Sequence, residues 1–395
     1  MRTEKNNHCI CAYLEGRIDS SNAAMLQKEL ETIRNESPGC ELVLDAGTLE
    51  YISSAGLRVL LQIRREQGSL TVWNITPEVY DILDMTGFTG LLNVKRKMRE
   101  LSVEGCEIVG RGAIGTVYRL DDDTIVKVYE RPDSLPMIEN EQKRAKQAFL
   151  KGIPTAISYD VVKVGEKYGS VFEMLKAITY NDYLIENPDK RDEIVRNYAC
   201  FIRSIHTVEM ESGELPPARD AFLGYMDSLR EYLPGDLYTR LRSLFEAMPE
   251  NQHIVHGDIQ MKNVMLSGNE PMLIDMDTLA VGDPVFDLMG LCVAYPMFNE
   301  DEPDNSQKFL GITGEMCDFV YRKTLEYYFS DLDAAVIREA EKKVRLVAYV
   351  RFLYLVAVLG IGLPELRRIR LEHTIGHMQE LAAQVDSLDI AGLYH

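Results

Sequence analysis

The sequence has little positive charge and lacks the usual features of a nucleic-acid-binding or membrane protein. Its 395 residues include 43 lysines and arginines against 62 aspartates and glutamates, which gives a formal net charge of −19. So acidic a chain repels phosphate backbones and anionic lipids, so neither nucleic acid nor a membrane is an expected partner. The most apolar run, residues 352–363, is too short to span a bilayer and is expected to form a buried helix.

Cysteine pairs with metal-binding spacing are also missing. The seven cysteines, an odd number, include no C-x-x-C pair. Residues 1–8 contain no apolar core of the kind that a secretory signal needs. We therefore expect a cytoplasmic protein in a reducing compartment.

The remaining composition is that of an ordinary globular protein, with 46% hydrophobic and 27% charged residues. The length is sufficient for two or three domains. The negative charge is unevenly distributed, because residues 1–100 have a net charge of −2 and the rest of the chain −17. An acidic cleft in the second part would attract cationic ligands such as amino sugars or choline-like amines, although acidity is also a common solubility device.

Two polar segments indicate a phosphoryl-transfer site. The segment HGDIQMKN at residues 256–263 lies between apolar stretches, and Asp275 follows another, in LIDMD at residues 273–277. Transfer from a magnesium nucleotide needs one carboxylate near the attacking hydroxyl and oxygen ligands for the metal. Asp258 fits the first role. Asn263 and Asp275 fit the second, since Mg²⁺ prefers oxygen ligands.

This pattern resembles the catalytic loop and metal-binding Asp of the protein-kinase-like fold. Three features are similar to the small-molecule branch, which includes aminoglycoside and choline kinases. Gly257 stands where protein kinases have an Arg, residues 276–277 are Met-Asp instead of Phe-Gly, and GDPVFDL at residues 282–288 stands in place of Ala-Pro-Glu. The resemblance implies that Asp287 is buried and orients the catalytic loop. For Asp277 a solvated loop position is the default expectation.

A glycine-rich segment precedes this site in the chain. GRGAIGTV at residues 110–117 has the form G-x-G-x-x-G-x-V, in which glycines let the backbone approach phosphates where a Cβ would collide. A Rossmann unit would continue from the motif into a helix, whereas residues 116–120 have the pattern of a strand. Lys127, on the next expected strand, is placed to reach the α- and β-phosphates. The predicted nucleotide-binding residues of the loop are Gly110, Gly112, Gly115 and Val117.

The same resemblance implies two further nucleotide-site features. Residues 135–150 have a helical pattern, and Glu141 is the candidate partner of the lysine, with Glu139 as the alternative. Glu173 and Leu175 belong to the expected hinge, whose backbone would meet the adenine.

Residues 1–98 have the pattern of an alternating α/β unit. The pattern predicts strands at residues 10–14, 41–45 and 70–75 and helices at residues 23–35 and from residue 53 onward.

This first unit resembles the STAS domain, the fold of bacterial anti-sigma factor antagonists. LEGRID at residues 14–19, LEYISSAGL at residues 49–57 and the stretch at residues 77–88 are similar to the family's entry segment, phosphoacceptor loop and last helix. The resemblance implies that Ser54 is a phosphorylation candidate and that the unit has a protein partner. A phosphate there would be stabilised by the free N–H groups of a helix N-terminus. Ser53 stands where the family usually has Asp, and the alternative is that Ser54 only caps the helix.

The predicted fold is an α/β STAS-like domain followed by an α+β bilobal protein-kinase-like domain. The expected boundaries are residues 1–98 for the first domain, 99–102 for a linker, 103–175 for the kinase-like N-lobe and 176–395 for a helical C-lobe.

The predicted function is transfer of the γ-phosphoryl group of ATP, with Mg²⁺, to the hydroxyl of a small-molecule acceptor. The STAS-like unit would act as a regulator. A signalling protein kinase that acts on Ser54 or on a partner protein is the alternative. A non-catalytic nucleotide sensor is a third hypothesis, and the complete set of catalytic residues argues against it.

Overall fold

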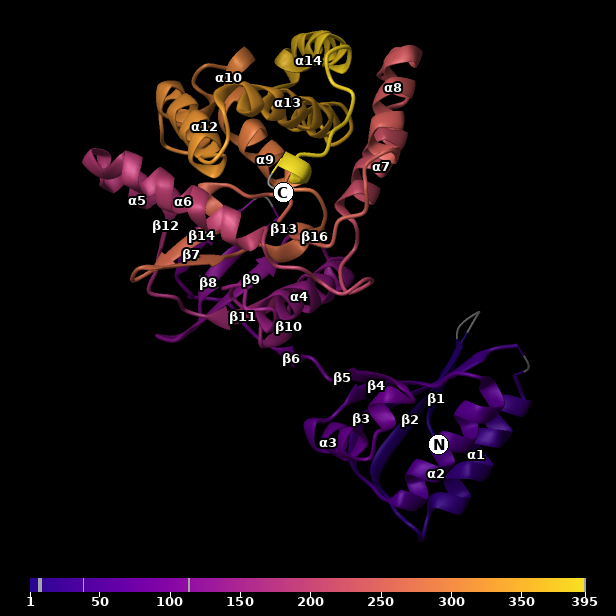
Figure 1. The fold of residues 1–395 in the computed structure, drawn as a ribbon. Helices are drawn as coiled ribbons and strands as arrows, with labels where there is room; N and C mark the ends of the chain where they lie inside the picture. Colours follow the sequence, from indigo (N-terminus) through magenta and orange to yellow (C-terminus); the bar gives the residue numbers. More distant parts are fainter. Residues whose placement is uncertain (6–8, 38, 113, 394–395) are drawn as a thin grey trace. The chain divides into compact units, whose positions relative to one another are not determined.

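The computed structural model describes residues 1–5, 9–37, 39–112 and 114–393. The chain divides into two compact units (Figure 1). The first comprises Met1–Ser102 with Val162–Gly165, and the second comprises Val103–Val161 with Glu166–His395. Separate clusters of buried apolar side chains lie in the two units, so each has a hydrophobic core of its own.

A five-stranded sheet forms the centre of the first unit. Its strand order is β1-β2-β3-β4-β5, with β1 antiparallel to β2 and the other neighbours parallel. The strands are β1 (Thr3–Lys5), β2 (Cys9–Ile18), β3 (Glu41–Ile52), β4 (Thr71–Ile75) and β5 (Asn93–Arg96). Buried and partly exposed side chains alternate along most of β2, as expected for a strand with one face on the core.

Short helices complete the first unit (Figure 1). They are α1 (Ala23–Asn35), α2 (Ser54–Gln67), α3 (Pro77–Met85) and the 3₁₀ turn η1 (Phe88–Gly90). Helices α1 and α2 pack against each other. Helix α2 also lies very close to the sheet at Gly56, where a Cβ atom would be 2.6 Å from Ile18 Cγ2 and 2.7 Å from Ile52 Cγ1.

The sequence pattern predicted the positions of the helices and strands in this unit more accurately than their lengths. Helix α1 has the predicted limits, but β3 runs to Ile52 instead of ending at residue 45, because it continues to pair with β2 after two register shifts. Strands β1 and β5 were not predicted. The two-residue strand β6 (Arg99–Glu100) lies within the expected linker.

The second unit begins with a sheet and one long helix. Strands β11, β9, β8 and β7 are neighbours in that order, and each pair is antiparallel. The elements are β7 (Ile108–Arg111), β8 (Gly115–Arg119), β9 (Thr124–Tyr129), α4 (Leu135–Leu150), β10 (Asp160–Val164) and β11 (Lys167–Glu173). Helix α4 has the predicted limits. Its buried residues Ile138, Glu141, Ala145 and Ala148 recur at helical spacing, so they share one face.

The rest of this unit is mainly helical (Figure 1). The α-helices are α5 (Tyr180–Glu186), α6 (Arg191–Ile205), α7 (Ala218–Leu229), α8 (Gly235–Glu246), α9 (Val285–Cys292), α10 (Phe298–Asp301), α11 (Asn305–Phe309), α12 (Gly314–Tyr328), α13 (Ala334–Ala357) and α14 (Arg367–Ala382). The single turns are η2 (Pro188–Lys190), the π-turn η5 (Val293–Met297), η6 (Pro364–Leu366) and η7 (Ala391–Leu393). Within the described ranges, every helix is too short or too polar to cross a membrane.

The expectation of a buried helix over residues 352–363 is only partly correct. Helix α13 ends at Ala357, and Val358, Leu359 and Ile361 are exposed. The helix cannot continue because Gly360 and Gly362 have φ values of 68° and 102°, in the left-handed region that favours glycine.

Short strand pairs bring the two predicted catalytic segments together. Strand β13 (Ile254–Val255) pairs with β16 (Ala280–Val281), and β14 (Val264–Ser267) pairs with β12 (Ile178–Thr179) and β15 (Glu270–Leu273). The 3₁₀ turns η3 (Met261–Asn263) and η4 (Met276–Thr278) lie in the connections. The loop between β13 and β14 and the loop between β15 and β16 are therefore joined at both ends, because β13 pairs with β16 and β14 pairs with β15.

The close contact at Gly56 predicts that Gly56→Ala destabilises the first unit by about 1–3 kcal/mol, because the new methyl group must displace Ile18 and Ile52. Urea unfolding followed by the fluorescence of Trp73 tests this, since Trp73 is the one tryptophan of the chain and lies on β4. Gly90→Ala is the control, because no neighbouring atom lies within 4 Å of its added Cβ. An unchanged midpoint for Gly56→Ala would contradict the packing.

Candidate active site

One cleft of about 700 Å³ in the second unit collects the predicted nucleotide and metal residues. Its walls come from the β7–β8 loop, β9, α4, the end of β11 and the two catalytic loops. The predicted residues that line it are Gly110, Gly112, Gly115, Val117, Lys127, Glu141, Glu173, Leu175, Asp258, Asn263 and Asp275. The sequence pattern therefore identified residues from six separate segments that share one cleft.

The glycine-rich segment belongs to the hairpin of β7 and β8, and its Ala113 is outside the described residues. The backbone N–H of Gly112 donates to the carbonyl of Gly115 at 2.9 Å. Only Gly115 is required by close packing, because its Cβ would lie 2.6 Å from the Val128 carbonyl oxygen on β9. Gly110 and Gly112 have room for a Cβ within the protein, so packing does not explain them and approach of a ligand can.

Lys127 lies between two carboxylates. Its Nζ is 3.7 Å from Glu141 Oε1, and it also donates a hydrogen bond to Asp275 Oδ1. Burial opposes the charged form, but these two carboxylates outweigh it and raise the pKa of Lys127. Glu141 is buried and accepts a hydrogen bond from Tyr129 Oη at 2.7 Å, whereas Glu139 is exposed. The structure thus places Glu141 beside the lysine and leaves the alternative outside the cleft.

The expected hinge follows β11. Glu173 pairs with Thr124 at the end of the sheet, and Glu173 and Leu175 both line the cleft. The N–H of Met174 already donates to the carbonyl of Asp123 at 2.7 Å. A base in the cleft would therefore meet backbone groups of Glu173 or Leu175 rather than the N–H between them.

Asp258 is oriented by the asparagine five residues later. Asn263 Nδ2 donates to Asp258 Oδ2 at 3.0 Å and to the Asp258 carbonyl oxygen at 2.8 Å. Gln260 Nε2 lies 3.3 Å from the same carboxylate oxygen. Burial raises the pKa of Asp258, and the charge of His256 and these hydrogen bonds oppose that shift. Because its amide nitrogen faces Asp258, Asn263 keeps its amide oxygen for another partner.

The two catalytic loops cross at Gly257, whose φ is 82°. A Cβ at this position would lie 2.9 Å from the Thr278 carbonyl oxygen, so the loops can approach this closely only without a side chain. Thr278 Oγ1 donates to the His256 carbonyl at 2.7 Å, and His256 Nε2 lies 2.9 Å from the Ile274 carbonyl oxygen. Glycine at 257 therefore has a steric reason in this structure.

Asp275 has a left-handed backbone conformation, with φ 57°. Such a conformation is uncommon for a residue with a side chain and costs roughly 1–3 kcal/mol unless the surroundings stabilise it. The hydrogen bond from Lys127 and the turn η4 that follows immediately supply contacts on both sides of the residue.

Asp287 holds the backbone of the catalytic loop through hydrogen bonds. Its buried carboxylate accepts hydrogen bonds from the N–H groups of His256 at 2.8 Å and Gly257 at 2.5 Å. His206 Nε2 lies 2.8 Å from the same carboxylate, and His206 Nδ1 lies 2.7 Å from Tyr328 Oη. Burial would raise the pKa of Asp287, but the His206 contact and the backbone donors outweigh it and lower the pKa. The predicted burial of Asp287 is confirmed.

The sequence analysis missed the positions of two residues: Asp277, which lines the cleft, and Arg144, which contacts the Asp277 backbone. Asp277 is not a freely solvated loop residue: it lines the cleft, and burial raises its pKa. Arg144 on α4 donates a hydrogen bond from Nη1 to the Asp277 carbonyl oxygen. This contact ties helix α4, which also carries Glu141, to the loop that carries Asp275. One signal was available, since Arg144 lies about one helical turn after Glu141 and so on the same face.

The donor set of the cleft suits Mg²⁺. Asp275 has one carboxylate oxygen that is not used by Lys127, and Asn263 has its amide oxygen. Across the described residues, no three His, Cys, Asp or Glu side chains gather as a complete metal cage. Mg²⁺ in nucleotide enzymes typically takes one or two protein oxygens and completes its shell with phosphates and water, so a sparse oxygen site fits it.

The predicted phosphorylation site lies in the first unit. Ser54 is exposed and is the first residue of α2, and the N-cap is Ser53, whose Oγ accepts a hydrogen bond from the Ala55 N–H at 3.2 Å. The alternative that Ser54 serves as the cap is therefore wrong, because Ser53 has this role. The hydroxyl of Ser54 remains at a helix N-terminus, where a phosphate would be stabilised.

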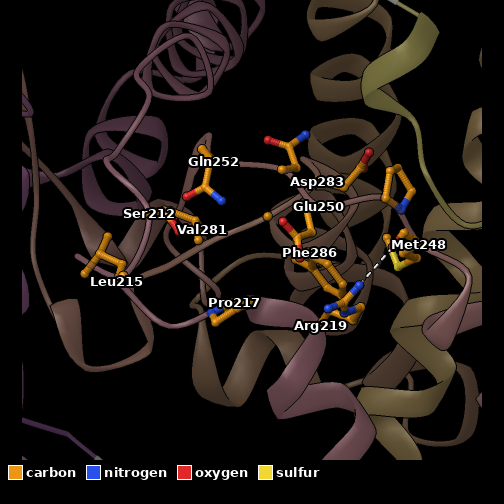
Figure 2. Close-up of a pocket in the computed structure, with 14 residues that line it drawn as sticks. Ser212, Leu215, Pro217, Arg219, Met248, Glu250, Gln252, Val281, Asp283 and Phe286 are labelled. Atoms are coloured by element: carbon orange, nitrogen blue, oxygen red, sulfur yellow. Dashed lines mark hydrogen bonds between the residues drawn. The ribbon is translucent and has the colours of Figure 1, made fainter.

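A second cavity, of about 250 Å³, shares no lining residue with the cleft (Figure 2). Two of its charged residues have internal contacts: Arg219 Nη1 donates to the Met248 carbonyl at 3.0 Å (Figure 2). Asp283 Oδ2 accepts hydrogen bonds from the N–H groups of Ile390 and Ala391 at 2.9 and 2.8 Å. The predicted site residues, which all fall in described ranges, lie elsewhere, so the larger cleft is the candidate active site.

The family comparison agrees with this geometry. Residues 105–315, more than half of the chain, match the model of the phosphotransferase enzyme family, and residues 1–101 match the STAS domain. The chain belongs to the phosphotransferase enzyme family and has an N-terminal STAS domain. The predicted fold, a STAS domain joined to a kinase-like domain, is confirmed.

Individual relatives match either unit. The first is similar to the "Putative anti-sigma factor antagonist BtrV" of Bordetella bronchiseptica, with 37% identity over 95 residues, 23% of this chain and 81% of that protein. Among solved structures, the ADP-bound aminoglycoside phosphotransferase APH(2'')-Ib has 18% identity and a TM-score of 0.46, covering 70% of this chain and 93% of that one. A choline/ethanolamine kinase family protein from Mesorhizobium loti has 16% identity and a TM-score of 0.46, with 70% and 87% covered.

The contacts of Asp287 predict that Asp287→Asn lowers the free energy of unfolding of the second unit. An amide in place of the carboxylate leaves at least one of the three converging donors without an acceptor, at a cost of about 1–3 kcal/mol. Differential scanning calorimetry of the full chain measures the effect. Asp386→Asn, at a fully exposed side chain, is the matched control and should melt like the wild type. Equal melting of both variants would mean that the Asp287 contacts contribute nothing to stability.

Proposed function

We propose that this protein transfers the γ-phosphoryl group of ATP to the hydroxyl of a small-molecule acceptor. The observation that supports this most directly is the shared cleft, in which Lys127 lies between Glu141 and Asp275 and opposite the Asp258–Asn263 pair. This arrangement supplies a cation for phosphates, oxygens for a metal and a carboxylate for the acceptor.

In this proposal the nucleotide is held from three sides. The hairpin with Gly110, Gly112, Gly115 and Val117 covers the phosphates, and Lys127 contacts them. The backbone around Glu173 and Leu175 holds the base. Asn263 and Asp275 would hold Mg²⁺, which neutralises charge on the phosphates when it is bound. Glu141 keeps Lys127 charged and oriented.

Asp258 would orient the acceptor hydroxyl and take its proton. A bond forms between the hydroxyl oxygen and the γ-phosphorus, the bond from that phosphorus to the β-phosphate bridging oxygen breaks, and ADP leaves. Such a transition state is loose and needs little basic help, so the proton moves late. Asn263 and Gln260 hold the carboxylate in place for this role.

The match to the STAS domain supports a regulatory function for the first unit. This unit would act by binding a partner protein. The limits that we propose are residues 1–98 for this domain, 99–102 for a linker, 103–175 for the N-lobe and 176–395 for the C-lobe. Exposure of Ser54 at the start of α2 supports its assignment as the phosphorylation candidate.

Asp258→Asn should lower the turnover number by roughly 10²- to 10⁴-fold, the usual contribution of a positioned proton acceptor, and should leave ATP binding nearly intact. Release of ADP measures turnover, and thermal shift with Mg²⁺ and ATP measures binding. Asp122→Asn, an exposed carboxylate in the β8–β9 turn, is the control and should behave as the wild type. Wild-type turnover in Asp258→Asn would exclude the proposed role.

The second candidate function is a signalling kinase that phosphorylates its own STAS domain, which the exposed hydroxyl of Ser54 favours. Incubation with Mg²⁺ and ATP followed by peptide mass spectrometry tests it. A phosphate on Ser54 in the wild type, and none in Asp258→Asn or Ser54→Ala, would identify a self-modifying signalling kinase. An unmodified wild type favours the small-molecule acceptor.

A further inference from the structure

A cluster of one arginine and two tyrosines lies where helices α7 and α13 pack together. Tyr225 of α7 stacks on Tyr354 of α13, with ring centroids 4.2 Å apart. The guanidinium carbon of Arg351 lies 4.9 Å from the centre of the Tyr225 ring and 5.9 Å from that of Tyr354. Stacking on aromatic rings fixes the plane of a guanidinium and leaves its N–H edge for a ligand.

Arg351 differs from the other arginines of α13. Arg345 Nε pairs with Glu341 at 2.9 Å, and Arg338 is exposed to solvent. Arg351 is half-buried, and no ion pair joins it to a carboxylate in the described part of the chain. A partly desolvated guanidinium without a counter-ion is suited to bind an anion.

The cluster lies within electrostatic reach of both catalytic loops. Burial raises the pKa of Asp258, and the positive charge of Arg351 is among the groups that oppose this shift. Burial also raises the pKa of Tyr225, and the negative charge of Asp277 adds to it. Helix α13 also packs against α9, and at Gly290 helix α9 lies against the backbone of Asp258 and Ile259, where an added Cβ would be 3.9 and 3.5 Å away. The cluster therefore lies on a helix that packs behind the loop of the carboxylate that would receive the acceptor hydroxyl.

We propose that Arg351, held by Tyr225 and Tyr354, binds an anionic group of the acceptor, so that the acceptor is a hydroxyl compound with a carboxylate or a phosphate. This inference rests on the proposed function, since the acceptor hydroxyl must reach Asp258. The planar fork of the guanidinium donates two parallel hydrogen bonds to either kind of anion. It also reverses the expectation of a cationic acceptor, because Arg351 repels an ammonium group.

Direct binding tests the inference with small hydroxyl compounds of different charge. The full-length protein is saturated with Mg²⁺ and the non-hydrolysable nucleotide AMP-PNP, so that no probe can occupy the phosphate site. Glycerate, glycerol 3-phosphate, glycerol and choline are then titrated by calorimetry. We expect saturable binding of one or both anions and none of glycerol or choline. The two anionic arms distinguish a carboxylate from a phosphate.

Arg351→Gln should weaken binding of the anion by about tenfold or more, the loss expected for a hydrogen bond between charged groups. Arg351→Lys keeps the charge, loses the fork and should show an intermediate loss. Arg338→Gln, on the same helix, is the control and should bind like the wild type. Melting temperature and AMP-PNP affinity should be unchanged in all three variants, which separates a binding role from a structural one.

Wild-type anion affinity in both folded Arg351 variants would overturn the inference. Absence of saturable anion binding to the wild type, or binding of choline in place of the anions, would overturn it equally. These outcomes leave the proposed function standing as long as AMP-PNP binds. Failure of the wild type to bind AMP-PNP would overturn the proposed function, and the acceptor inference with it.

Discussion

The buried carboxylate of Asp287 is the interaction on which the geometry of the active site depends. A carboxylate without water is costly unless donors and positive charge compensate it. Here two backbone N–H groups of the catalytic loop and the ring of His206 converge on it. Asp287 accepts hydrogen bonds from the backbone of His256 and Gly257. It therefore determines the position of the next residue of the loop, Asp258. The position of the catalytic loop is thus determined by a buried residue of helix α9.

A different constraint places the loop that carries Asp275, since that constraint is the absence of a side chain at Gly257. Without a Cβ at Gly257, Thr278 can approach the catalytic loop and bond to it. The left-handed conformation of Asp275 costs free energy, and the ion pair with Lys127 offsets part of that cost. Removal of the hydrogen bond from Thr278 to His256, or of the ion pair between Lys127 and Asp275, would therefore change the conformation of both loops, because each loop is stabilised by the other.

The sequence allowed Lys127, Asp258 and Asp275 to be predicted, because each lies within or directly after an apolar strand segment. It did not allow the prediction of contacts that depend on tertiary packing. Arg144 reaches a backbone carbonyl, which no side-chain pattern records. Strand β3 continues beyond Asp45 because its partner strand continues, and a local pattern cannot show this. Ser53 and Ser54 are adjacent hydroxyls with the same propensity to cap a helix, so only the backbone geometry distinguishes them.

Net charge and local charge lead to different expectations for the acceptor. The second part of the chain has a net charge of −17, but that sum is spread over exposed side chains, and water and salt screen such charges over about 10 Å. The affinity of a binding site depends instead on the few charges that lack both water and a partner. In the active site the carboxylates already have partners, since Glu141 and Asp275 share Lys127 and Asp258 faces Asn263. Among the described residues the guanidinium of Arg351 on α13 is one charge that lacks an ion pair, so at this position the local charge favours an anion even though the domain is acidic.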